Sequence, residues 1–193
     1  MNAQPRIVEA SLRVCLAAYA EYTPEPYLLG QLVAVREGRW TTYAVVADAK
    51  SGPEDPSRPL QAHGGTETAR EIFAEHPHIQ PLLRTHLTLV SCGHASGVAF
   101  RPVVPPSPPP LLAIVEACGA EEVVRATGDA GFLAMLVASP ECDDAVLTAA
   151  IRSAADSAED RRGYIVKAGK ELARLLRAEP SRLTTILRGV IDG

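Results

Sequence analysis

A run of prolines near the middle of the chain most constrains its fold. Residues 102–110 read Pro-Val-Val-Pro-Pro-Ser-Pro-Pro-Pro, which places six of the 16 prolines of this 193-residue chain within nine positions. Each proline fixes φ and lacks a backbone N–H donor, so the segment is extended and is neither a helix nor a central strand. We therefore expect a semi-rigid linker over 105–110, between an N-terminal domain (1–104) and a C-terminal domain (111–193).

The N-terminal half alternates runs of β-branched residues with Gly and Pro. Its strand candidates are the segments 6–10, 12–22, 30–35, 40–48 and 84–92. A helix with Thr66 as its N-cap is expected between the last two, from Thr66 to Glu75. Short strands with tight turns favour a small closed β-barrel of about six strands with one inserted helix, because closure leaves no unpaired edge.

After the prolines, Ala, Leu and charged residues recur at helical spacing. Ser139-Pro140 has the form of a helix start, residues 160–177 give the longest helix candidate, and Glu179-Pro180 starts the last helix. The predicted fold class is therefore α+β, with the small closed barrel followed by a C-terminal α-helical bundle. The sequence leaves open whether the bundle packs on the barrel.

Several N-terminal segments are similar to one known barrel family. The opening strand Arg6-Ile7-Val8-Glu9-Ala10-Ser11 is followed by matching segments at 29–35, 43–49, 87–90 and the Pro-rich exit at 105–108. Together they resemble the HAS-barrel (HerA–ATP synthase barrel) family over roughly the first half of the chain. The resemblance implies a non-catalytic barrel that packs subunits into a ring beside an ATPase core. Only a helical segment follows the prolines here, so the resemblance implies neither ATPase activity nor nucleotide-binding residues.

A set of basic residues is the candidate contact surface. They recur at helical spacing along the longest predicted helix and the next one: Lys167, Lys170, Arg174, Arg177, Arg182 and Arg188. Such a stripe suits an acidic protein surface or a nucleic-acid backbone, although a solvated helix face is the simplest interpretation. The chain has a net charge of −4, and residues 141–193 hold nine basic and nine acidic residues, so a global basic field is absent.

The cysteines and histidines give weaker candidates. The four cysteines have no CxxC spacing and are expected to be reduced, partly buried thiols: Cys15, Cys92, Cys118 and Cys142. Cys92 and His94, two apart on a predicted strand, form a candidate nucleophile pair without a recognisable oxyanion hole. His76, His78 and His86, with Glu71 and Glu75 nearby, are candidate metal ligands, but their spacing favours ordinary histidines. We expect no metal and no cofactor.

We therefore expect a cytoplasmic, non-catalytic interaction or assembly protein, since no apolar run is long enough to cross a membrane. Its partner would be a HerA-like ATPase or translocase, or another copy of the chain. Two alternatives stay open. One is an accessory of DNA metabolism, including repair, that binds nucleic acid through the basic stripe. The other is an enzyme with an unrecognised site.

Overall fold

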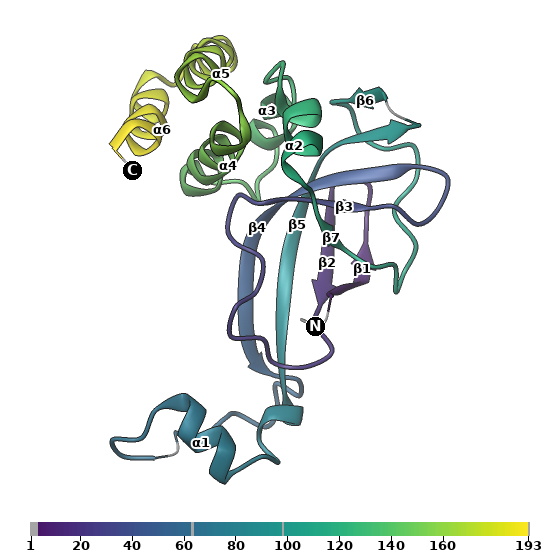
Figure 1. Ribbon diagram of the computed structural model, residues 1–193, viewed down its shortest axis with the longest axis vertical. Coiled ribbons are helices and arrows are strands. Elements are labelled where there is room, and N and C mark those ends of the chain that lie inside the picture. Colours follow the sequence, from purple (N-terminus) through teal and green to yellow (C-terminus); the bar gives the residue numbers. More distant parts are fainter. Residues whose placement is uncertain (1–3, 63, 98, 193) are drawn as a thin grey trace.

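The computed structural model describes residues 4–62, 64–97 and 99–192. It is α+β, with one antiparallel sheet at the centre, helices α2 to α6 gathered at one end and α1 at the other (Figure 1). The strands of the described part are β1 (Arg6–Ala10), β2 (Val14–Ala18), β3 (Leu32–Val35), β4 (Thr41–Pro53), β5 (Leu83–Ser96), β6 (Ala99–Arg101) and β7 (Glu116–Ala117). The helices are α1 (Ala69–Glu75), the 3₁₀ helix η1 (Gln80–Leu82), α2 (Ala120–Thr127), α3 (Leu133–Val137), α4 (Asp144–Ser157), α5 (Arg161–Leu175) and α6 (Pro180–Asp192).

The predicted closed barrel is wrong, because the sheet is open. Its seven strands run in the order β1-β2-β5-β4-β3-β7, with β6 beside β5, so β1 and β7 are edges. A closed barrel needs a continuous ladder between its first and last strands. Among the described residues, β1 meets the segment just before β7 through an isolated bridge between Arg6 and Ile114 and a few backbone hydrogen bonds around it, and no strand ladder forms there.

Two features of the sequence explain the open sheet. The prolines up to Pro110 have no N–H donors, and Leu112 has a positive φ of 65°, so regular pairing resumes only in the two-residue strand β7. In addition, β4 and β5 are 13 and 14 residues long and extend well past the strands on either side. A small barrel requires strands of matched length, and these two continue outward instead.

The two faces of the sheet bury different clusters. One face holds a core of strand residues and residues next to strands, with none from a helix, and it includes Ile7, Leu87 and Val115. The other face is covered by helices in a single cluster that joins strand residues such as Val45 and Cys92 to helix residues such as Leu147. The bundle therefore packs on the sheet, which settles a question that the sequence left open. The boundaries 1–104 and 111–193 stay a prediction, although β7, beyond the prolines, pairs with β3.

Local sequence fixes where the helices begin. Asp143 caps α4 by accepting from Val146 N, and Asp160 caps α5 by accepting from Gly163 N. The first of these lies four residues after the expected cap Ser139. Similarly α1 is capped by Thr68, which forms a reciprocal capping box with Glu71, and not by Thr66. No helix in the described part of the chain combines the length and the apolar character needed to cross a bilayer.

Candidate functional site

The longest strands form an arm that leaves the body of the protein. β4 and β5 pair from Thr41 opposite Ala95 to Pro53 opposite Leu83, with two register shifts along the way. β3 accompanies β4 only as far as Val45, and β2 accompanies β5 only as far as His86. The last part of the hairpin is therefore a two-stranded arm that carries α1 away from the other helices (Figure 1).

Residues 54–82 form the tip of this arm. Glu54 N donates to Leu82 O at 2.9 Å, which closes the hairpin at the base of the tip. The helix α1 has no buried residue, and its aromatic residue Phe73 packs its ring 5.4 Å from that of Tyr22. The tip is thus held by caps, turns and a few apolar contacts and has little core of its own.

The tip contains an apolar cavity of about 490 Å³. Its apolar lining residues are Pro53, Pro59, Leu60, Ile79, Leu82 and Leu83, and its polar lining residues are Glu54, Asp55, Arg58, Gln61 and His78. Leu60 is 53% exposed and Leu82 is 59% exposed, so both leave more than half of their apolar surface in water. A concave apolar surface with a few convergent polar groups is the usual form of a binding site.

Ion pairs order one side of the cavity. Arg84 lies 3.0 Å from the Glu54 carboxylate and donates to the carbonyl oxygens of Pro81 and Leu83. Asp55 accepts from the Ser57 hydroxyl and from Ser57 N, and these bonds lower the pKa of Asp55, while Arg58 approaches it to 3.5 Å. The carboxylates of Glu54 and Asp55 are therefore held in place at the rim, both more than half exposed.

The tip as a whole is acidic. Residues 54–82 contain five carboxylates and two arginines, a formal net charge of −3 out of the −4 of the chain. Combined with the apolar lining, this charge favours a ligand that carries apolar side chains flanked by cations. The Gly- and Pro-rich sequence from 51 to 65 indicated only a loop, so the sequence missed this cavity. The signal available was a long insertion between two β-rich segments.

The predicted basic stripe is partly used inside the protein. Lys167 Nζ donates to Gly128 O at 2.8 Å, Arg174 pairs with Glu171, and Arg182 Nε lies 2.6 Å from Asp144 Oδ1. The other three predicted residues are exposed and have no hydrogen bond or ion pair with any residue that the structure describes: Lys170, Arg177 and Arg188. The structure therefore leaves half of the predicted stripe available to a partner.

The predicted pair Cys92 and His94 does not form a nucleophilic site. Tyr43 pairs with Gly93 and Ala44 with Ser91, so Cys92 is the extra residue of a β-bulge and the alternation of faces breaks there. Cys92 is fully buried in the cluster beneath the helices, and burial raises the pKa of its thiol well above the ordinary value. His94 Nδ1 instead lies 3.2 Å from Val103 O, and its ring packs against Trp40.

The candidate metal ligands do not converge. The rings of His76 and His78 contact each other at 5.8 Å, whereas His86 lies on β5 between Ala18 and Lys50. In the described part of the chain, which leaves out His63, no three His, Cys, Asp or Glu side chains come together in a way that would hold a metal ion.

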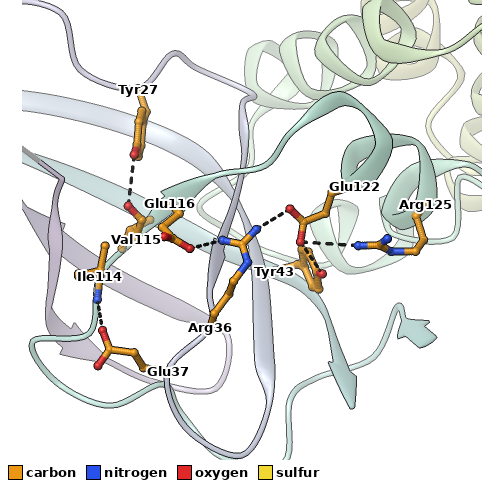
Figure 2. Close-up of polar contacts among 9 residues, drawn as sticks. All are labelled: Tyr27, Arg36, Glu37, Tyr43, Ile114, Val115, Glu116, Glu122 and Arg125. Atoms are coloured by element: carbon orange, nitrogen blue, oxygen red, sulfur yellow. Dashed lines mark hydrogen bonds and ion pairs between the residues drawn. The ribbon is translucent and has the colours of Figure 1, made fainter. Parts of the chain in front are cut away.

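A second polar cluster lies where α2 meets the sheet. Figure 2 shows the Arg36 guanidinium between the carboxylates of Glu116 on β7 and Glu122 on α2. Glu122 also accepts from the Tyr43 hydroxyl at 2.8 Å and has Arg125 at 3.8 Å. Burial, reinforced by Glu122, raises the pKa of Tyr43 to about 12. Because every charge in this cluster has a partner within the cluster, its role is to fasten α2 and β7 to the sheet.

Comparison with known proteins gives no family for this chain. Neither a scan against protein-family models nor a search of the curated proteins finds a match. The resemblance to HAS-barrel proteins therefore stays a prediction from the residues quoted for it.

Proposed function

We propose that this chain is a cytoplasmic, non-catalytic interaction protein that binds another protein through the cavity at the tip of its arm. The observation that carries the proposal is the exposure of Leu60 and Leu82 around an apolar cavity in a tip of net negative charge. Leaving these leucines in water costs stability, at about 25 cal/mol for each Å² of apolar surface, and binding a partner removes that cost.

The arm supports a docking role in a second way. The tip lies at the opposite end of the molecule from α5 and α6 (Figure 1), so a partner bound there meets the arm without displacing the helical bundle. The predicted resemblance suggests a ring-forming ATPase or translocase as partner, or another copy of this chain. Either partner would offer a protein surface, which suits a binding site that consists of leucines and carboxylates.

The test is recovery of partners with a tip variant. Tagged wild-type protein and the Leu82→Glu variant are each recovered from native lysate after nuclease treatment, and the bound proteins are identified by mass spectrometry. We expect wild type to retain a defined partner and Leu82→Glu to lose it, because a carboxylate replaces the apolar contact. Leu28→Glu is the matched control, since Leu28 is 73% exposed on a loop outside the tip.

The nuclease step separates this proposal from binding to nucleic acid. Partners that vanish with nuclease, together with salt-dependent binding of duplex or single strands, would favour the basic stripe and contradict docking at the tip. Equal recovery by wild type, Leu82→Glu and Leu28→Glu would also contradict it, because the tip would then play no part.

A further inference from the structure

We propose that the tip cavity of one copy binds the exposed face of helix α5 of a second copy, so that the protein associates head to tail. This inference rests on the proposed function, since it names the occupant of the same cavity. It is carried by charge complementarity between two surfaces of the chain that cannot reach each other within one molecule.

The first of these surfaces is the tip described above. It combines the half-exposed leucines Leu60 and Leu82 with the rim carboxylates Glu54 and Asp55, which stay more than half exposed beside their partners Arg84 and Arg58. Three further carboxylates of the tip make no ion pair with any described residue, namely Glu67, Glu71 and Glu75. A surface that fits it must offer small apolar groups between cations, on a convex element narrow enough to enter a cavity of about 490 Å³.

Helix α5 presents such a surface. One stripe is exposed along the whole of α5 and continues just past its end, and it consists of Arg162, Val166, Lys170 and Ala173 in the helix and Arg177 two residues beyond it. The four helical residues follow each other at steps of three or four, which places them on one narrow face of α5, and Arg177 lies in the turn that follows the helix. Val166 is 52% exposed, so apolar surface lies between the cations. We call these five residues the α5 stripe.

The cations of the α5 stripe have no partner within the molecule. Arg162, Lys170 and Arg177 make no hydrogen bond or ion pair with any residue that the structure describes, whereas the neighbouring Lys167 and Arg174 do. The nearby carboxylates have other partners: Glu171, next to Lys170, is held by Arg174 at 2.5 Å, and Glu179, two residues after Arg177, lies 3.6 Å from Arg182. Asp160, two residues before Arg162, accepts from Gly163 N. The stripe is therefore a row of three uncompensated positive charges, while the tip carries −3.

The contact between the tip and the α5 stripe must form between two copies of the chain. The tip and α5 lie at opposite ends of the molecule (Figure 1), so the tip of a copy cannot touch its own α5 stripe. A contact between two different surfaces is heterologous, and it produces rings or open chains instead of a closed pair. We therefore expect association to continue beyond the dimer as concentration rises.

Sedimentation velocity on the full chain tests the proposal. The weight-average mass of wild type is expected to rise between about 5 and about 300 µM at about 50 mM salt, and to return toward the monomer at about 500 mM salt, where charges are screened. The stripe variant Lys170→Glu with Arg177→Glu is expected to weaken association at least about tenfold. The control Arg13→Glu with Arg101→Glu makes the same charge change at exposed residues outside the stripe and should associate as wild type does.

A charge exchange makes the test specific. The tip variant Glu54→Lys with Asp55→Lys should also fail to associate alone. Mixed with the stripe variant, it should restore association, because the acidic stripe fits the basic tip and the two unchanged surfaces fit each other. Restoration also shows that both variants are folded.

The outcomes separate this inference from the proposed function. A wild-type monomer over the whole concentration range, or no restoration on mixing, would overturn the head-to-tail contact. The proposed function would still stand if another protein were recovered through Leu82. Association that is unchanged in both the stripe and the tip variants would also overturn the head-to-tail contact, whereas equal recovery of partners by wild type and Leu82→Glu would overturn the proposed function.

Discussion

Gly30 lies where the loop before β3 touches helix α4, and it provides a direct test of the packing between sheet and helices. Its φ is +77°, and a Cβ added to it would lie 2.3 Å from the carbonyl carbon of Ala149 and 2.4 Å from Ala150 N. Both are backbone atoms of α4, which cannot move aside as a flexible side chain would. Gly30→Ala therefore requires the helix to shift away from the sheet.

The expected cost has two parts. A residue with a Cβ in this left-handed conformation costs about 1 to 2 kcal/mol. Crowding a well-packed contact costs a further 1 to 3 kcal/mol or so. We expect Gly30→Ala to lower the free energy of unfolding by about 2 to 5 kcal/mol, a large share of the stability of an ordinary domain.

Gly97 supplies the matched control. It has a similar φ of +71°, but no atom of the other described residues, its chain neighbours aside, lies within 4 Å of a Cβ added to it. Gly97→Ala should therefore show the conformational cost alone, about 1 to 2 kcal/mol. Urea unfolding of both variants and wild type, followed by far-UV circular dichroism, measures the difference. Equal losses in the two variants would refute the close approach of α4 to the loop at Gly30.

Three further predictions follow from the buried polar groups. Burial raises the pKa of Tyr43 and of Tyr164 to about 12, above the ordinary value of about 10, so the unfolded chain loses these protons first. The free energy of unfolding should thus hold below about pH 10 and fall as pH rises toward about 12. Urea titrations at stepped pH measure this fall, and Tyr43→Phe should reduce it. An unchanged fall in Tyr43→Phe would contradict the raised pKa of Tyr43. Cys15, Cys92 and Cys142 are buried, and burial raises the pKa of each thiol. We therefore expect these thiols to resist alkylation until urea unfolds the protein, as measured by intact mass. Rapid labelling of Cys92 in the native protein would contradict this expectation. Arg36→Gln removes the closest partner of Glu122, whose side chain is only 15% exposed. It should lower the free energy of unfolding in urea by about 1 to 2 kcal/mol. Arg39→Gln, at a neighbouring exposed arginine, is the control and should lower it by less.

The elements of this fold were largely readable from local patterns. The strand at residues 6–10, the helix after Asp160 and the helix at Pro180 are where the sequence predicted them. Each is defined by signals a few residues apart, namely β-branched runs, caps and helical spacing.

The prediction of a closed barrel was wrong because closure of a sheet is not a local property of the sequence. Whether β1 meets the last strand depends on how the chain returns after Pro110, and the positive φ of Leu112 has no signature in a sequence that reads Leu-Leu. The bulge at Cys92 escaped notice for the same reason, since a two-residue spacing predicts a shared face unless an extra residue is known to be present.

The candidate site was less accessible still. The cavity depends on two strands that extend beyond their neighbours and on an insertion whose leucines stay partly exposed. Neither property can be predicted from composition or local spacing. The basic stripe was predictable from spacing, but the loss of Lys167, Arg174 and Arg182 to partners depends on Gly128, Glu171 and Asp144, of which only Glu171 is close in sequence.

Hydrogen exchange tests the central claim, that the arm tip is where this protein binds protein. Amide exchange is compared between dilute protein and the bound state, which is either concentrated protein at low salt or the complex recovered after nuclease treatment. The account predicts slower exchange on binding within the tip, residues 54–82, with the α5 stripe slowed as well when the partner is a second copy. Protection confined to other surfaces, with exchange in residues 54–82 unchanged, would contradict it.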